Sequence, residues 1–167
     1  SPYTMVAWTL GDWVYADSAL FYRTARFQAL DSGEIWVSKA PMLPFSRAWT
    51  PSFPRLIQWV LLEDLYSGAT FLFANTHLDN NGENKPPAAA LFGDSIPSMA
   101  AHVPVIATGD FNTHDNEARF STIRGVLLDA FSLVDEVTLS GQHAGLDFTR
   151  PELFPDRRID HILVSDG

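Results

Sequence analysis

The sequence predicts an α/β (α+β) fold in which two packed β-sheets carry helices on their outside. Short aromatic and β-branched segments predict strands, and these segments outnumber the helical ones. The predicted helices fall between strands, as in layered domains. The chain has 167 residues, and 46% of them are hydrophobic. This length and composition predict one domain, residues 1–167, with a sizeable core.

In the first half of the chain, four segments predict strands. Residues 19–23 and 33–38 are short and aromatic, and the Asp-Ser-Gly at 31–33 predicts a turn between them. Residues 55–63 are apolar on both faces, which indicates a central strand covered on each side. The following turn predicts that residues 70–78 return as the second strand of a hairpin.

The middle of the chain predicts a loop, a helix and a buried strand. Residues 79–87 are polar and indicate a loop. A short helix is expected within residues 88–102, although Gly93 and Pro97 disfavour it. Residues 103–110 form an apolar run that predicts another buried strand.

The last third of the chain predicts a surface helix and a final strand. Residues 115–125 suit a helix with Asp115 as its N-cap and Gly125 as its stop. A loop-rich region that contains residues 146–156 follows, and residues 157–165 predict the closing strand.

Charge and composition narrow the classes of function. Eleven basic residues stand against twenty acidic ones, for a net charge of −9. A general nucleic-acid binder normally has a basic surface, so this signal is missing, although a bound cation can supply positive charge locally. The chain contains no cysteine and no apolar run near the ~20 residues that a membrane span needs. The sequence predicts no membrane span and leaves the compartment open between secreted and cytoplasmic.

Polar residues cluster where three predicted strands end. The clusters are Asn-Thr-His-Leu-Asp at 75–79, Gly-Asp-Phe-Asn at 109–112 and Arg-Arg-Ile-Asp-His at 157–161. Active sites in layered α/β folds collect at the ends of central strands. We therefore expect these distant segments to meet at one edge of a sheet.

Within the second cluster, Asp110 and Asn112 stand two residues apart and face the same way in extended backbone. Asp110 can orient water or bind a hard cation, and the amide of Asn112 can donate to a phosphoryl oxygen. The alternative is an ordinary turn after a strand, which these residue types form readily. Taken alone, the cluster leaves both interpretations open, and His114 and Asp115 are assigned to the start of the next helix.

His77 and Asp160 carry the same ambiguity. His77 follows an apolar strand and is either a hydrogen-bonded structural residue or a donor to phosphate oxygens. Asp160 lies between apolar residues in a strand, where a carboxylate is costly unless it is paired. It forms either a local salt bridge or the partner that orients a catalytic imidazole.

Together, the three clusters in this order resemble the endonuclease/exonuclease/phosphatase superfamily, which has the deoxyribonuclease I-like fold. The stretches "ALFYRTARFQALDSGEIWVS" and "FPRLIQWVLLED" are similar to its bacterial and fungal branch. The resemblance spans Ala19 to Ser165. It implies a four-layer sandwich of two packed mixed β-sheets flanked by helices, incomplete at both ends.

The resemblance also implies metal-dependent hydrolysis of a phosphoester bond by in-line attack of an activated water, with Mg²⁺, Mn²⁺ or Ca²⁺ as cofactor. It implies catalytic roles for His77, Asp110, Asn112 and Asp160, with His77 and Asn112 binding the substrate and Asp110 and Asn112 binding the metal. By the same resemblance, Asp160 orients a later catalytic histidine, and His161 is structural. The partner is then a phosphoester substrate, either nucleic acid or a small phosphodiester, and the oligomeric state stays open.

Two motifs of this family have no counterpart in the chain. The family begins with a strand that carries an Asn and then a metal-binding Glu, and it ends with a Ser-Asp-His segment. We expect the chain to be a fragment that is inactive or impaired by itself, and we interpret Asp17, Glu34 and Glu63 as solvated residues. The competing hypothesis is a catalytically inactive binding or scaffold domain with the same fold.

Overall fold

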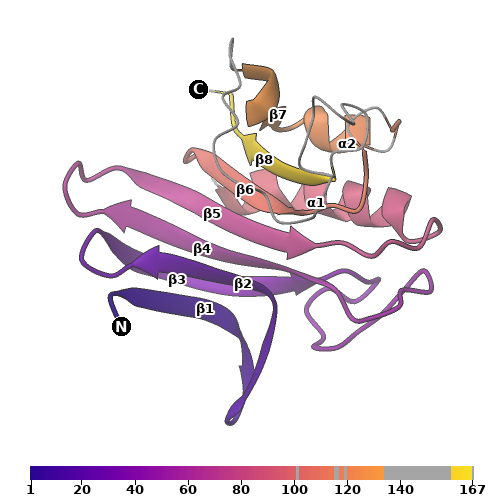
Figure 1. The fold of residues 1–167 in the computed structure, drawn as a ribbon, viewed down its shortest axis with the longest axis horizontal. Coiled ribbons are helices and arrows are strands. Elements are labelled where there is room, and N and C mark those ends of the chain that lie inside the picture. The colour runs from indigo at the N-terminus through magenta and orange to yellow at the C-terminus, as the bar shows by residue number, and fades with distance from the viewer. Residues whose placement is uncertain (101, 115–116, 119, 134–158, 167) are drawn as a thin grey trace, which may run out of the picture.

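The computed structural model describes residues 1–100, 102–114, 117–118, 120–133 and 159–166. Its strands are β1 (Tyr3–Leu10), β2 (Trp13–Arg23), β3 (Phe27–Trp36), β4 (Leu56–Asp64), β5 (Thr70–His77), β6 (Val105–Asp110), β7 (Leu128–Asp129) and β8 (Asp160–Val164). Its helices are α1 (Lys85–Ala100), α2 (Phe120–Arg124) and the short 3-10 helix η1 (Ala130–Leu133). Figure 1 shows their arrangement.

The strands form two sheets. β1 and β2 make an antiparallel pair, and the other six strands make one mixed sheet in the order β3-β4-β5-β6-β8-β7. β5 and β6 run parallel, while the other described neighbours in this sheet run antiparallel. A parallel pair needs a long crossover, and α1 supplies it between β5 and β6.

The six-stranded sheet is covered on both faces because its central strands alternate between two cores. On β5, Leu72 and Ala74 are buried in the core that includes α1. Phe71 and Phe73 point the other way and pack against the cluster that contains Leu20 of β2. The two packed sheets with helices outside are therefore confirmed, and in the described residues α1 and α2 lie on the face away from β1 and β2 (Figure 1).

The strand predictions for residues 55–63 and 70–78 are confirmed. They correspond to β4 and β5, which pair antiparallel as a hairpin. β4 lies between β3 and β5, as its two apolar faces predicted. The strand predicted at residues 103–110 is confirmed as β6. Of the strand predicted at residues 157–165, β8 confirms the part Asp160–Val164, and residues 157 and 158 lie outside the described residues.

The N-terminal strands extend further than predicted. β1 was not predicted at all, and β2 begins at Trp13 rather than at residue 19. The prediction of a turn at residues 31–33 was wrong, because these residues lie inside β3 and pair with β4 after a bulge at Ala29 to Asp31. Strand pairing overrides the turn propensity there. Gly33 fits because an added Cβ would lie 2.9 Å from the Trp59 ring.

α1 is also longer than predicted. It spans Lys85–Ala100 and includes both Gly93 and Pro97. Its buried side chains recur at helical spacing, with Ala88, Phe92, Ile96 and Ala100 on one face, so packing against β5 and β6 outweighs the unfavourable residues. The preceding loop consequently ends at residue 84 instead of residue 87.

The helix predicted in residues 115–125 is present as α2, and Gly125 follows its last turn. The predicted N-cap Asp115 and the loop-rich segment 146–156 lie outside the described residues. The backbone N–H of His114 donates to Glu117 Oε1 at 2.9 Å, so this residue belongs to the approach to α2. In the part of the chain that the structure describes, no helix is both long and apolar enough to span a membrane.

Candidate active site

The three polar strand ends meet at one edge of the six-stranded sheet. His77 of β5 pairs in register with Asp110 of β6, and Asp110 pairs with Asp160 of β8. Residues that are paired in register point to the same face of a sheet. The convergence expected from the sequence is therefore present, as one row of three side chains.

A cleft of about 500 Å³ opens over this row. A second row lies beneath it, because Asn75, Thr108 and Ile162 are also paired in register. Thr108 Oγ1 donates to Asn75 Oδ1 at 3.0 Å, so this row joins two hydrogen-bonded polar side chains to the apolar side chain of Ile162. The full lining is Asp17, Asn75, Thr76, His77, Thr108, Gly109, Asp110, Asp160, His161 and Ile162.

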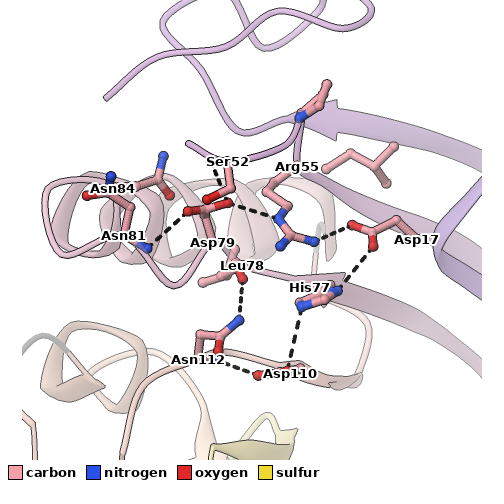
Figure 2. A network of polar contacts seen from close by, with 12 residues as sticks. Asp17, Ser52, Arg55, His77, Leu78, Asp79, Asn81, Asn84, Asp110 and Asn112 are labelled. Atoms are coloured by element: carbon pink, nitrogen blue, oxygen red, sulfur yellow. Dashed lines mark hydrogen bonds and ion pairs between the residues drawn. The ribbon is translucent and has the colours of Figure 1, made fainter. Parts of the chain in front are cut away.

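His77 lies between two carboxylates at the centre of the cleft (Figure 2). Its Nδ1 is 3.1 Å from Asp17 Oδ1, and its Nε2 is 3.6 Å from Asp110 Oδ2. The hydrogen bond with Asp17 raises the pKa of His77 above its ordinary value, against the opposing effect of burial. Because the side chain is 34% exposed, the ring can meet both solvent and a ligand.

Asp17 is held in place by Arg55, at the boundary of the two sheets. Arg55 Nη1 donates to Asp17 Oδ2 at 2.8 Å, and Nε donates to Asp79 Oδ2 at 3.4 Å. Asp79 is fully buried and also accepts the backbone N–H groups of Ser52 and Asn81 at 2.9 and 3.0 Å. Figure 2 shows this network leading from the loop after β5 to the cleft.

The pKa of Asp17 reflects this network. Burial acts to raise it, but the hydrogen bonds from His77 and Arg55 outweigh burial and hold the pKa below its ordinary value. Asp17 is an exposed strand residue, as interpreted from the sequence, but its ion pairs with Arg55 and His77 were not expected, and Arg55 was not identified from the sequence. β2 begins with the aromatic and β-branched run Trp13-Val14-Tyr15, and this composition is the signal that could have revealed the strand.

Asp110 and Asn112 are joined by a local turn. The backbone N–H of Asn112 donates to Asp110 Oδ1 at 2.8 Å, and its side-chain Nδ2 donates to the carbonyl oxygen of Leu78 at 2.8 Å. Asn112 has a φ of 47°, which is left-handed. The turn interpretation of this cluster is therefore correct. Asp110 lines the cleft, whereas Asn112 is not one of the residues that line it.

Gly109 allows β6 to approach β5 at this point. Its φ is 154°, and a Cβ at this position would lie only 2.1 Å from the carbonyl oxygen of Thr76. No side chain fits such a distance, so glycine is required for the register that sets Asp110 beside His77.

Asp160 completes the row on the far side of Asp110. Partial burial and the neighbouring Asp110 carboxylate raise the pKa of Asp160. The adjacent His161 points to the opposite face, where its side chain is fully buried. Its contribution to the cleft lining is therefore made by backbone.

The site offers hard oxygen ligands for a divalent cation. Among the described residues, no group of three or more His, Asp or Glu side chains gathers as a metal site. Mg²⁺ is commonly held by one or two carboxylates together with waters and substrate phosphates. The Asp110 carboxylate and the Asn112 amide oxygen fit this partial set, since the Asn112 bond to Leu78 uses the nitrogen and leaves the oxygen.

Comparisons with known proteins agree on one family. The model of the endonuclease/exonuclease/phosphatase family matches residues 15–167. A family protein from Bacteroides vulgatus is 29% identical with a TM-score of 0.80, over 98% of this chain and 65% of that chain. The mannosyl-6-phosphatase Bt3783 of Bacteroides thetaiotaomicron is 28% identical with a TM-score of 0.78, over 99% of this chain and 62% of that chain.

A more distant likeness concerns the fold alone. The catalytic domain of human Nocturnin is 20% identical with a TM-score of 0.63, over 89% of this chain and 52% of that chain. No curated protein matches the sequence significantly. The chain thus spans less than two thirds of the length of these solved relatives.

Proposed function

Because the chain belongs to the endonuclease/exonuclease/phosphatase family, we propose that the protein hydrolyses phosphoester bonds at the cleft over β5, β6 and β8. The single observation that supports this most is the row of His77, Asp110 and Asp160, with Asp17 behind the histidine. It combines a positioned imidazole with carboxylates on one exposed face, which is what general acid–base chemistry requires.

In this proposal His77 binds and stabilises the phosphoryl group. Asp17 accepts a hydrogen bond from Nδ1, and this fixes the ring so that Nε2 faces the cleft. The raised pKa of His77 favours the protonated ring, whose Nε2–H can donate to a phosphoryl oxygen as negative charge develops. Arg55 acts through Asp17 as a positioning residue, because it anchors the carboxylate from the other side.

Asp110 is proposed to orient the attacking water and to accept its proton. One of its oxygens is occupied by the backbone N–H of Asn112, so the other, Oδ2, faces His77 and the cleft. Asn112 would hold the phosphate or the cation through its amide. Its side-chain amide is fixed by the bond to the Leu78 carbonyl oxygen, and its backbone N–H holds it beside Asp110, which lines the cleft.

Asp110 and Asn112 would hold a divalent cation, with Mg²⁺, Mn²⁺ or Ca²⁺ as candidates. When bound, the cation would neutralise charge on the phosphate and lower the pKa of a bound water. Asp160 is proposed as an orienting carboxylate at the end of the row. Its raised pKa is consistent with a carboxyl group beside a second one.

We infer that the substrate is a small phosphoester rather than a long polynucleotide. The net charge of −9 opposes a polyanion, whose binding depends on neutralising many phosphates. One solved relative is described as a mannosyl-6-phosphatase, which makes sugar phosphates the first substrates to test.

The test is hydrolysis by the purified protein with Mg²⁺. The substrates are mannose 6-phosphate, p-nitrophenyl phosphate, bis(p-nitrophenyl) phosphate and single-stranded DNA, each with and without EDTA. We expect slow turnover of the small esters, in keeping with the impaired activity that the sequence leads us to expect of this chain. EDTA should abolish this turnover, and Asp110→Asn should remove it. Binding of phosphoesters without turnover of any of them would instead support an inactive binding domain of the same fold.

A further inference from the structure

His161 lies one row away from the cleft residues, on the opposite face of the same sheet. It pairs in register with Gly109, which pairs with Thr76, so the row behind the cleft row is Thr76, Gly109 and His161. The imidazole is fully buried and packs on the Phe120 ring at 4.1 Å between centroids. The edge of Phe111 contacts it at 5.7 Å.

Both ring nitrogens of His161 have polar partners. Nδ1 is 3.1 Å from Asp129 Oδ2, and Nε2 donates to the carbonyl oxygen of Thr113 at 3.1 Å. The carbonyl oxygen can only accept, so Nε2 must carry a proton. Asp129 and Thr113 are themselves 2% and 4% exposed, which means that water cannot easily replace either bond.

Thr113 directly follows Asn112, and this links the buried histidine to the cleft. Asn112 adopts a left-handed backbone conformation that residues with a Cβ rarely occupy. Such a conformation persists when surrounding contacts determine it from several sides. On one side Asn112 is tied to Asp110 and Leu78. On the other side the bond from His161 to the Thr113 carbonyl fixes the peptide unit between Thr113 and His114, one residue further along.

We propose that His161 is a positioning residue, which holds Thr113 so that Asn112 stays hydrogen-bonded to Asp110, the carboxylate that lines the cleft. Asp129 orients the ring from β7, and Phe120 of α2 supports its face. Packing alone does not require a histidine, because an aromatic hydrocarbon ring would fill the same space. The two hydrogen bonds are what the histidine adds. The catalytic part of this inference rests on the proposed function.

The experiment uses His161→Phe, which keeps a ring against Phe120 and removes both hydrogen bonds. The matched control is Ile123→Val, which removes one methyl group from the same core without touching the loop. We expect kcat for the small ester to fall by about 10- to 100-fold in His161→Phe, since small misplacements cost that much, while KM stays within about threefold. The control Ile123→Val should keep the kcat and the KM of the wild type.

A second measurement does not need activity. The side-chain amide signals of Asn112 in a ¹H–¹⁵N NMR spectrum should move in His161→Phe and stay in place in Ile123→Val. If wild-type protein shows no turnover, the proposed function fails, and these signals alone decide the positioning role. If His161→Phe does not fold, the double variant His161→Phe with Asp129→Leu removes the buried carboxylate that has lost its histidine partner. Unmoved Asn112 signals, or an unchanged kcat in an active protein, would overturn the proposal.

Discussion

The molecule contains two histidine–aspartate pairs with the same separation and opposite surroundings. His77 lies 3.1 Å from Asp17, and His161 lies 3.1 Å from Asp129. Both histidines belong to the joined strands β5, β6 and β8, in neighbouring rows of the sheet. The first side chain is 34% exposed in the cleft, whereas the second is fully buried under α2.

The difference shows that the pleat of the sheet decides what each pair can do. Successive residues of a strand point to opposite faces, so a shift of one residue separates the cleft from the core. The exposed pair can exchange protons with solvent and touch a ligand. The buried pair can only hold other groups of the protein in position. Five substitutions, in four tests, examine this division, beginning with the largest expected effect.

Asp110→Asn should affect the cleft alone. The change removes the proposed proton acceptor and keeps the shape of the side chain. We expect the rate of phosphoester hydrolysis to fall by about 10²- to 10⁴-fold, the usual contribution of a general base. The free energy of unfolding, from urea denaturation, should change by less than about 1 kcal/mol. Asp94→Asn on the exposed side of α1 is the control and should leave the rate unchanged.

Gly109→Ala should disrupt both faces together, because Gly109 pairs with β5 and with β8. Its Cβ would lie 2.1 Å from the Thr76 carbonyl oxygen. We expect a loss of at least about 3 kcal/mol in the free energy of unfolding from this clash and the backbone strain. Gly82→Ala, where a Cβ meets nothing within 4 Å, is the matched control. A stable Gly109→Ala protein would contradict the tight approach of β5 and β6.

His161→Ala and His77→Ala compare the two pairs directly by stability. His161→Ala leaves a cavity and removes a partner of buried Asp129, so we expect a loss of about 3 kcal/mol. His77→Ala removes a partly exposed ring, so less than about 1 kcal/mol should be lost. Thermal and urea unfolding measure both values. If both variants lost the same free energy of unfolding, this would contradict the distinction between an exposed pair in the cleft and a buried pair in the core.

Asp17→Asn should produce the smallest effect, a shift in the titration of His77. The hydrogen bond with Asp17 raises the pKa of His77, so this variant should lower that pKa, as followed by NMR of the ring signals. Because the pKa of His77 is higher in the folded protein than in the unfolded chain, where it is about 6.5, protonation of this residue adds to the free energy of unfolding. This contribution is fully present below the unfolded-state pKa, and it is lost as the pH rises through the folded-state pKa.

The stability difference between wild type and Asp17→Asn should therefore be larger at about pH 5 than at about pH 9, since Asp17 stays ionised throughout this range. Asp12→Asn, in the exposed turn between β1 and β2, serves as the control. If the pKa of His77 does not change in Asp17→Asn, the proposed hydrogen bond between Asp17 and His77 is contradicted.

The sequence predicts the central part of this fold well. The strands around residues 55–63, 70–78 and 103–110 have apolar patterns that result from burial on both faces, and the structure confirms them. The meeting of the three polar clusters was also predictable, because each cluster stands at the end of such a strand. The assigned roles of His77, Asp110, Asn112 and Asp160 stay predictions.

The partners of these residues could not be predicted in the same way. Asp17 belongs to β2, whose exposed aromatic positions obscure the alternation of a strand, and it reaches His77 across sixty residues of sequence. Arg55 is the first residue of the segment predicted as a central strand, and nothing in that segment indicates that it joins Asp17 to Asp79. Such contacts depend on how two sheets pack, which local patterns do not encode.

The alternation of cleft row and core row limits how this segment can change in evolution. A deletion or insertion of one residue within β8 would exchange Asp160 and His161 between the two faces. The carboxylate would then enter the core beside Asp129, and the imidazole would lie in the cleft. Length changes near this strand are therefore tolerated only outside β8, or in steps of two residues, whereas substitutions that keep its length are accepted more readily.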